Sequence, residues 1–294
     1  MSEDPEIFPS LALPDELPPP APQSRRIPNF GHTVLFFIVA VIVMLFTSVS
    51  VFALAMGFHW FGSETSEQLL REPRLLIPAM AVGYLIAGTI VWAIFVNLWR
   101  QPLGAALHWN FAVVSRRWPS LLVGGIVLSL VVQFLSNFLP VPKSLPIDDF
   151  FRTSADVWMV ALFGTFMAPL FEELAFRGFL LPSLASTWDW LRGRKDDVSP
   201  ADVSSKRDPR WSAAALAVSC TLTSIGFALV HSDQLAHAWA PLAVLFAVSL
   251  VLCFVRLWTN SLAASTMIHA TYNGTIFTIV FFVTGGFRHL DKIT

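Results

Sequence analysis

The chain has 294 residues, of which 55% are hydrophobic and 13% are charged, and its formal net charge is −1. A soluble domain averages about 45–50% apolar and about 25% charged residues, so this composition excludes an ordinary soluble protein and indicates a membrane protein. The near-neutral charge also gives no electrostatic case for nucleic acid as a partner.

Residues 1–30 differ in composition from the rest of the chain. They contain eight prolines and five acidic residues, and such a segment cannot bury enough apolar surface to fold. The sequence therefore predicts a disordered, proline-rich tail over residues 1–30 and a membrane domain over residues 31–290.

Seven apolar runs follow the tail, most of them near the length of about 20 residues that crosses a bilayer core as a helix. We therefore expect an all-α fold, a polytopic membrane helix bundle with about seven transmembrane helices. A further stretch, residues 103–117, is expected to form an interfacial helix at headgroup depth. The seven runs are residues 33–56, 75–99, 120–139, 156–186, 211–231, 238–258 and 261–283.

The distribution of Lys and Arg between the loops predicts the orientation of the bundle. With the N-terminus inside, twelve Lys and Arg fall in inside segments and six in outside segments, which is the asymmetry expected of cytoplasmic loops. We therefore predict an integral, multi-pass protein with a cytoplasmic N-terminus and, for seven spans, an outside C-terminus. We place it in the plasma membrane of a prokaryote, since the sequence shows no eukaryotic sorting signal.

The fourth run contains the segment FEELAFRGFL, which places three charged side chains at membrane depth. Ionisable groups there are costly and by default indicate function. Glu173 and Arg177 have i, i+4 spacing with the acid first, the favourable order for a helical ion pair. Glu172 points about 100° away and has no local partner, so it is the candidate general base. Pro169 is expected to free the Thr165 carbonyl and to kink the helix.

Two later runs bring imidazoles into the membrane. His231 ends the fifth run with Phe227 one turn before it, and His269 and Asn273 have i, i+4 spacing in the seventh run. Unsatisfied polar groups in lipid are costly, so we expect these residues to gather with the charges of the fourth run. Counting residues nevertheless places His231 at the outer face of the membrane. Spacing alone leaves open whether the cluster is a catalytic site or a structural polar network.

The three motifs together resemble the CAAX-processing and bacteriocin-processing (CPBP) family of intramembrane proteases. This family is also called the ABI family, and it includes the prenyl-protein endopeptidases. The resemblance covers roughly residues 156–283, the expected protease-like core, and the chain departs from the pattern at no motif position. The family motifs EExxxR, FxxxH and HxxxN are here Glu172-Glu173-Leu-Ala-Phe-Arg177, Phe227-Ala-Leu-Val-His231 and His269-Ala-Thr-Tyr-Asn273.

The resemblance implies a chemical role for four of these residues. Glu172 is expected to act as general base on a water molecule, with His231 helping to hold and activate it. His269 and Asn273 are expected to donate hydrogen bonds to the developing oxyanion of the scissile carbonyl.

The resemblance gives three further residues supporting roles. Glu173 and Arg177 are expected to pair and to fix the helix that carries Glu172. Phe227 is expected to form a wall of the substrate pocket. No serine or cysteine stands out as a nucleophile, which fits attack by water.

The sequence does not decide whether a metal takes part. The family has been described as metalloproteases, and Glu172, His231 and His269 would be adequate ligands for a divalent metal such as zinc. The HExxH motif is absent, however, and these three ligands come from three helices. We favour metal-free water activation and leave a metal open.

The expected function is an intramembrane endopeptidase acting on a membrane-associated peptide or protein. A lipidated, CAAX-type substrate follows only from the resemblance. One alternative is a non-catalytic membrane scaffold or bacteriocin-immunity-type binding protein, which the intact motifs disfavour. A second is a transporter or proton channel, which would need further acids along a path, and residues 33–56, 75–99 and 238–258 contain none.

Overall fold

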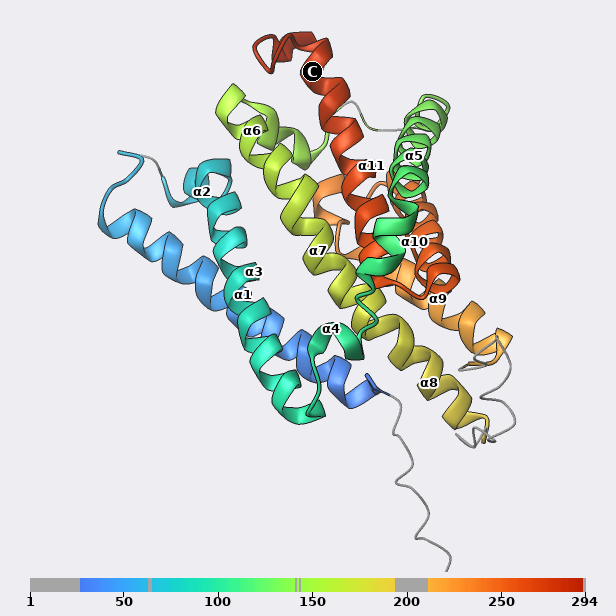
Figure 1. The fold of residues 1–294 in the computed structure, drawn as a ribbon. Helices are drawn as coiled ribbons and strands as arrows, with labels where there is room; N and C mark the ends of the chain where they lie inside the picture. Colours follow the sequence, from blue (N-terminus) through green and yellow to red (C-terminus); the bar gives the residue numbers. More distant parts are fainter. Residues whose placement is uncertain (1–26, 63–64, 141, 143, 194–210, 293–294) are drawn as a thin grey trace, which may run out of the picture.

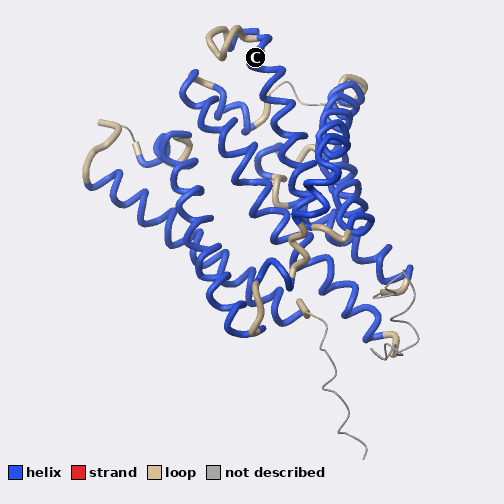
Figure 2. The backbone as a smooth tube through the Cα atoms, viewed as in Figure 1, coloured by secondary structure: helices blue, strands red, loops and turns tan. Residues whose placement is uncertain are grey.

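The computed structural model describes residues 27–62, 65–140, 142, 144–193 and 211–292. Within these residues the chain forms helices and no strand (Figure 2), which confirms the predicted all-α fold. The predicted tail of residues 1–30 lies almost wholly outside the described residues, as does most of the loop after the fourth apolar run.

The α-helices are α1 (Phe30–Gly57), α2 (Ser66–Leu69), α3 (Pro73–Trp99), α4 (Leu103–Ala106), α5 (Phe111–Ser136), α6 (Ser154–Leu162), α7 (Ala168–Glu173), α8 (Leu181–Leu191), α9 (Ala213–Leu229), α10 (Trp239–Thr259) and α11 (Leu262–Val283). Three short 3-10 segments are η1 (Pro146–Phe151), η5 (Asp233–Leu235) and η6 (Leu290–Lys292). Two π-helical segments are η2 (Phe163–Met167) and η3 (Leu174–Leu180).

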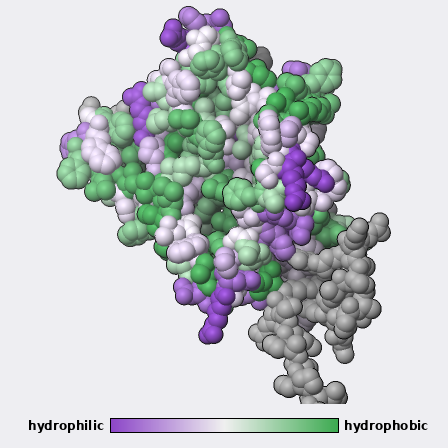
Figure 3. All heavy atoms as spheres, in the orientation of Figure 1, coloured by the Kyte–Doolittle hydropathy of each residue, from purple (hydrophilic) through white to green (hydrophobic). Residues whose placement is uncertain are grey.

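The helices have the length and surface of membrane spans. In the described part of the chain, six are long and apolar enough to cross a membrane, and α9 is a shorter apolar helix of 17 residues. Large apolar side chains point outward, with Phe46, Phe254 and Phe282 at 73%, 63% and 74% exposure. Figure 3 shows hydrophobic residues over much of one face of the molecule. The protein is therefore an integral, multi-pass membrane protein, as the sequence predicts.

The bundle is organised around one long helical segment, residues 154–191, which runs through α6, η2, α7, η3 and α8 without a break (Figure 1). The antiparallel hairpin of α1 and α3 packs along one side of this segment. Helices α5, α9, α10 and α11 lie on the other side, with α5 packed against α11. This packing is close, because a Cβ at Gly125 of α5 would lie 2.6 Å from Thr271 Cβ and 2.9 Å from the Ile268 carbonyl oxygen.

The predicted interfacial helix over residues 103–117 is wrong. The chain forms the single turn α4, breaks after it, and enters the long helix α5 at Phe111. The break is stabilised by tertiary hydrogen bonds that its carbonyls accept. Leu262 N–H donates to His108 O (3.0 Å), and Arg256 Nη2 donates to Leu107 O (3.3 Å). Such long-range partners outweigh local helix propensity.

The long segment changes hydrogen-bond register on either side of the two glutamates. In η2 the Ala168 N–H donates to Phe163 O, five residues back. In the same register the N–H of residue 169 would donate to the Gly164 carbonyl. Residue 169 is a proline, which has no N–H. The freed carbonyl is therefore that of Gly164 and not the predicted Thr165. Single π-turns inside α-helices are frequent at functional sites, and here they flank α7, which carries Glu172.

Candidate active site

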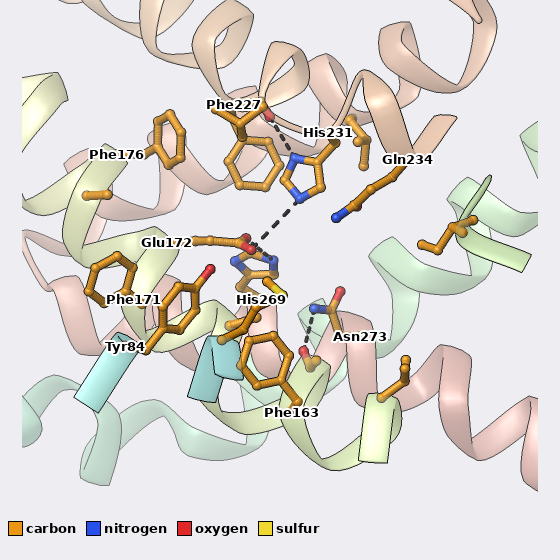
Figure 4. Close-up of a pocket in the computed structure, with 18 of the residues that line it drawn as sticks. Tyr84, Phe163, Phe171, Glu172, Phe176, Phe227, His231, Gln234, His269 and Asn273 are labelled. Atoms are coloured by element: carbon orange, nitrogen blue, oxygen red, sulfur yellow. Dashed lines mark hydrogen bonds and ion pairs between the residues drawn. The ribbon is translucent and has the colours of Figure 1, made fainter. Parts of the chain in front are cut away.

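Three helices bring their polar side chains to one place (Figure 4). The Glu172 carboxylate of α7 lies between two imidazoles, 3.8 Å from His231 Nε2 and 3.7 Å from His269 Nε2. His231 reaches this depth because α9 is short: 17 residues rise only about 25 Å at 1.5 Å per residue. The short helix leaves His231 beside Glu172, so the two residues meet in spite of the different depths counted from the sequence.

Glu173 faces a different environment from its neighbour Glu172. Its side chain is fully buried, and its Oε1 accepts from Arg177 Nη1 at 3.0 Å and from His269 Nδ1 at 3.0 Å. Arg177 is also fully buried and donates from Nη2 to the Ser249 carbonyl (3.1 Å) and hydroxyl (2.6 Å) of α10. Additional hydrogen bonds of this kind offset the cost of burying an ion pair. Through them the predicted Glu173–Arg177 pair links α7, η3, α10 and α11.

Both imidazoles present Nε2 to Glu172. His269 Nδ1 lies 3.0 Å from Glu173 Oε1. An ionised carboxylate only accepts hydrogen bonds, so His269 Nδ1 carries a proton. His231 Nδ1 lies 2.8 Å from the Phe227 carbonyl oxygen, which also only accepts, so Nδ1 of this ring is protonated too. The second nitrogen of each neutral ring is then an acceptor, directed at the Glu172 carboxylate and at any water beside it.

The remaining motif residues support this arrangement. Asn273 Nδ2 donates to the Gly164 carbonyl at 2.7 Å, the oxygen that Pro169 leaves free. One N–H of the Asn273 amide is thereby used. The Phe227 ring contacts three members of the cluster, with its centroid 4.7 Å from Arg177 Cζ, 5.0 Å from the His231 ring and 5.8 Å from the His269 ring.

The cluster opens into a cavity of about 840 Å³ whose walls are mostly apolar. The α1–α3 hairpin forms one wall, and the loop after His231 forms another. Glu172 and His231 are partly exposed, at 17% and 21%, while Glu173 is not exposed at all. Of the two adjacent acids, only Glu172 can meet a molecule in the cavity.

The structure therefore gathers all seven residues predicted for the site, and their chemical roles stay predictions. Sequence reasoning missed two cavity residues whose polar ends point toward the cluster in Figure 4, namely Tyr84 of α3 and Gln234 of η5. Gln234 follows His231 by three residues, a signal that was available. Tyr84 lies in an apolar run with no motif, so no pattern in the sequence marks it as a site residue.

The predicted metal ligands fit a metal ion in chemical type but not in placement. A carboxylate and two imidazoles with protonated, hydrogen-bonded Nδ1 atoms are suitable donors for zinc. Among the described residues, however, no group of three or more His, Cys, Asp and Glu is placed to hold one ion. We therefore derive no step through a metal.

Comparison with known proteins bears on the same part of the chain. Residues 154–275 match the family model described as type II CAAX prenyl endopeptidase Rce1-like. This range holds every predicted site residue and excludes the α1–α3 hairpin. It overlaps the predicted core of residues 156–283, whose limits stay a prediction. The chain matches no curated protein and no solved structure. The match covers 122 of the 294 residues and supports assignment of this part of the chain to the CPBP (CAAX protease) family.

Proposed function

We propose that the protein hydrolyses a peptide bond of a membrane-associated substrate with a water molecule activated by Glu172. The observation that carries this proposal is the placement of Glu172, which is partly exposed to the cavity and flanked by His231 Nε2 and His269 Nε2 at 3.8 and 3.7 Å. A carboxylate in a largely apolar site is a suitable general base. The cavity supplies room for the substrate beside it.

The reaction begins with water held between Glu172 and His231. Glu172 takes a proton from the water, while His231 Nε2 accepts its second hydrogen as a hydrogen bond. The water oxygen attacks the scissile carbonyl carbon, and the carbonyl oxygen becomes an oxyanion. When the carbon–nitrogen bond breaks, protonated Glu172 returns the proton to the leaving amine, so that atoms and charge balance.

The oxyanion is stabilised by donors on α11. Asn273 has a second N–H beyond the one held by Gly164. His269 donates from Nε2 when its ring carries a second proton, while its Nδ1 stays on the Glu173 carboxylate. Glu173 and Arg177 hold His269 and the helix in position, a contribution that acts through His269 and not on the substrate.

The substrate class that we propose is a peptide attached to the membrane, including a lipidated CAAX-type peptide. Two observations support it: the printed description of the matched family and the large apolar cavity beside Glu172. The wall formed by α1 and α3 suits an acyl or isoprenyl chain or an apolar segment. We further propose that the N-terminus is cytoplasmic and that the protein lies in a prokaryotic plasma membrane.

The test compares the wild type with Glu172→Gln, expressed at equal levels in a host without the native gene. New peptide termini are then mapped across the membrane proteome. Termini that arise only with the wild type would support proteolysis by Glu172 and identify the substrates. Identical termini, with both proteins folded and abundant, would contradict the proposal and favour a non-catalytic scaffold.

A further inference from the structure

The α3 helix lies outside the region matched by the protease family, yet it places a side chain at the site. The Tyr84 ring stacks on Phe171, the residue before Glu172, with centroids 4.2 Å apart and planes 13° apart. A second aromatic contact, to Phe163 at 5.4 Å, holds the other side of the ring. Figure 4 shows the phenol oxygen pointing from this stack toward Glu172 and His269.

The Tyr84 hydroxyl is close to the reacting groups but is not used by them. Tyr84 lines the same cavity as Glu172, His231 and His269. In the part of the chain that the structure describes, no side-chain hydrogen bond involves this hydroxyl. Tyr84 is half-buried with its ring held by stacking, so its hydroxyl is available to donate to a ligand in the cavity.

The two motif donors near Glu172 are partly committed or conditional. Asn273 spends one N–H on Gly164. His269 directs its Nδ1 proton to Glu173, so its Nε2 donates only after the ring is protonated. Tyr84 offers a neutral O–H donor that is already oriented by ring stacking and points toward Glu172 and His269 (Figure 4).

We propose that Tyr84 is a catalytic residue that donates a hydrogen bond from its hydroxyl to the oxyanion of the tetrahedral intermediate. The proposal rests on the proposed peptidase function and adds to it a donor from the N-terminal hairpin. No proton is transferred to the oxyanion: the phenol keeps its proton throughout, and the bond shortens as charge develops. Donors of this kind act on the transition state more than on the bound substrate.

The first test is Tyr84→Phe, which keeps the ring and its stacking and removes only the hydroxyl. The purified full-length protein is reconstituted in liposomes with an internally quenched, farnesylated CAAX peptide. If this peptide is not cleaved, a peptide that spans a terminus found in the membrane proteome replaces it. Loss of one oxyanion donor lowers kcat by about 100-fold or more, so we expect a fall of that order with KM within about twofold of wild type.

The second test separates a hydrogen-bond donor from a packing residue. The chain has two tyrosines, so Tyr272→Phe leaves Tyr84 as its only phenol. Replacing tyrosine by 3,5-difluorotyrosine in this background makes the phenol more acidic. We expect kcat to rise at neutral pH, because a more acidic phenol is a stronger hydrogen-bond donor.

The outcomes separate this inference from the proposed function. A wild type that cleaves, with an unchanged kcat either in Tyr84→Phe or after fluorination, would overturn the role of Tyr84 alone. A wild type that cleaves no membrane peptide would overturn both. A loss seen only as a higher KM would assign Tyr84 to substrate binding and would also overturn the oxyanion role.

Discussion

The helices of residues 154–283 and the hairpin of α1 and α3 meet along one cavity, but they bury different kinds of side chain. In the first region Glu173, Arg177 and His269 are buried, and each hydrogen bonds to another helix or helical segment. Apart from Tyr84 and Ser48, the hairpin instead faces the cavity with apolar side chains, and it turns others outward, such as Phe46. The polar region is suited to the chemistry, and the hairpin is suited to hold an apolar substrate beside it.

The two regions also differ in how they pack. A Cβ at Gly125 would meet Thr271 Cβ and the backbone of Ile268, neither of which can move away easily. A Cβ at Gly83 in the hairpin would meet Met44 Sδ at 2.6 Å, the flexible end of a long side chain. The contact of α5 with α11 of the polar region is therefore rigid, while the contact between α1 and α3 of the hairpin can adjust.

The largest expected effect on stability comes from breaking the buried pair of the polar region. Glu173→Gln leaves Arg177 buried without its counter-charge, and removal of one partner of such a pair costs about 3–5 kcal/mol. We expect a loss of this order in the free energy of unfolding, measured by denaturant titration in detergent. The double variant Glu173→Gln/Arg177→Met should recover much of it, and a single variant as stable as wild type would contradict the assigned role.

The next largest effect is expected on catalytic activity, and it shows whether His231 takes part in the reaction. His231→Asn removes the Nε2 atom beside Glu172, and loss of a group that assists general base catalysis costs about 100-fold in kcat. The matched control is His237→Asn, six residues later, whose side chain is 72% exposed. We expect the control to keep wild-type activity, and equal losses in the two variants would show that the loop and not His231 matters.

A smaller effect is expected on the free energy of unfolding when alanine replaces a glycine in each of two helix contacts. Overpacking a close contact costs about 1–3 kcal/mol, so Gly125→Ala should lower the free energy of unfolding by that amount. Gly83→Ala adds the same methyl group against a flexible Met44 and should be neutral or stabilising, because alanine favours a helix over glycine by about 1 kcal/mol. The reverse order in denaturant titrations would mean that the hairpin is the more rigid contact.

No effect is expected from removing metal ions. Treatment with 1,10-phenanthroline should leave the rate of peptide cleavage unchanged, since the mechanism derived from the described residues uses no metal. The non-chelating isomer 1,7-phenanthroline serves as the control for binding of the compound itself. A loss of activity with the chelator alone, restored by added zinc, would contradict this mechanism and assign Glu172, His231 and His269 as ligands.

Much of this arrangement could be predicted from the sequence, because membrane helices and motif spacing are local signals. Apolar runs of about 20 residues gave the spans, and i, i+4 spacing gave the Glu173–Arg177 pair. The role of Gly164 could not be predicted, because it depends on a π-turn that moves the hydrogen-bond register by one residue. Tyr84 could not be predicted either, because it reaches the site only through the packing of α3 against residues 163–171.

The most direct test of the account measures cleavage and unfolding on the same preparation of Glu172→Gln. Glu172 is partly exposed and takes no part in the buried pair, so its replacement should leave the buried ion pair intact. The account predicts that cleavage falls by about 100- to 10,000-fold, the range for a lost general base, while the free energy of unfolding stays at the wild-type value. Wild-type cleavage by a folded Glu172→Gln protein would contradict the central claim.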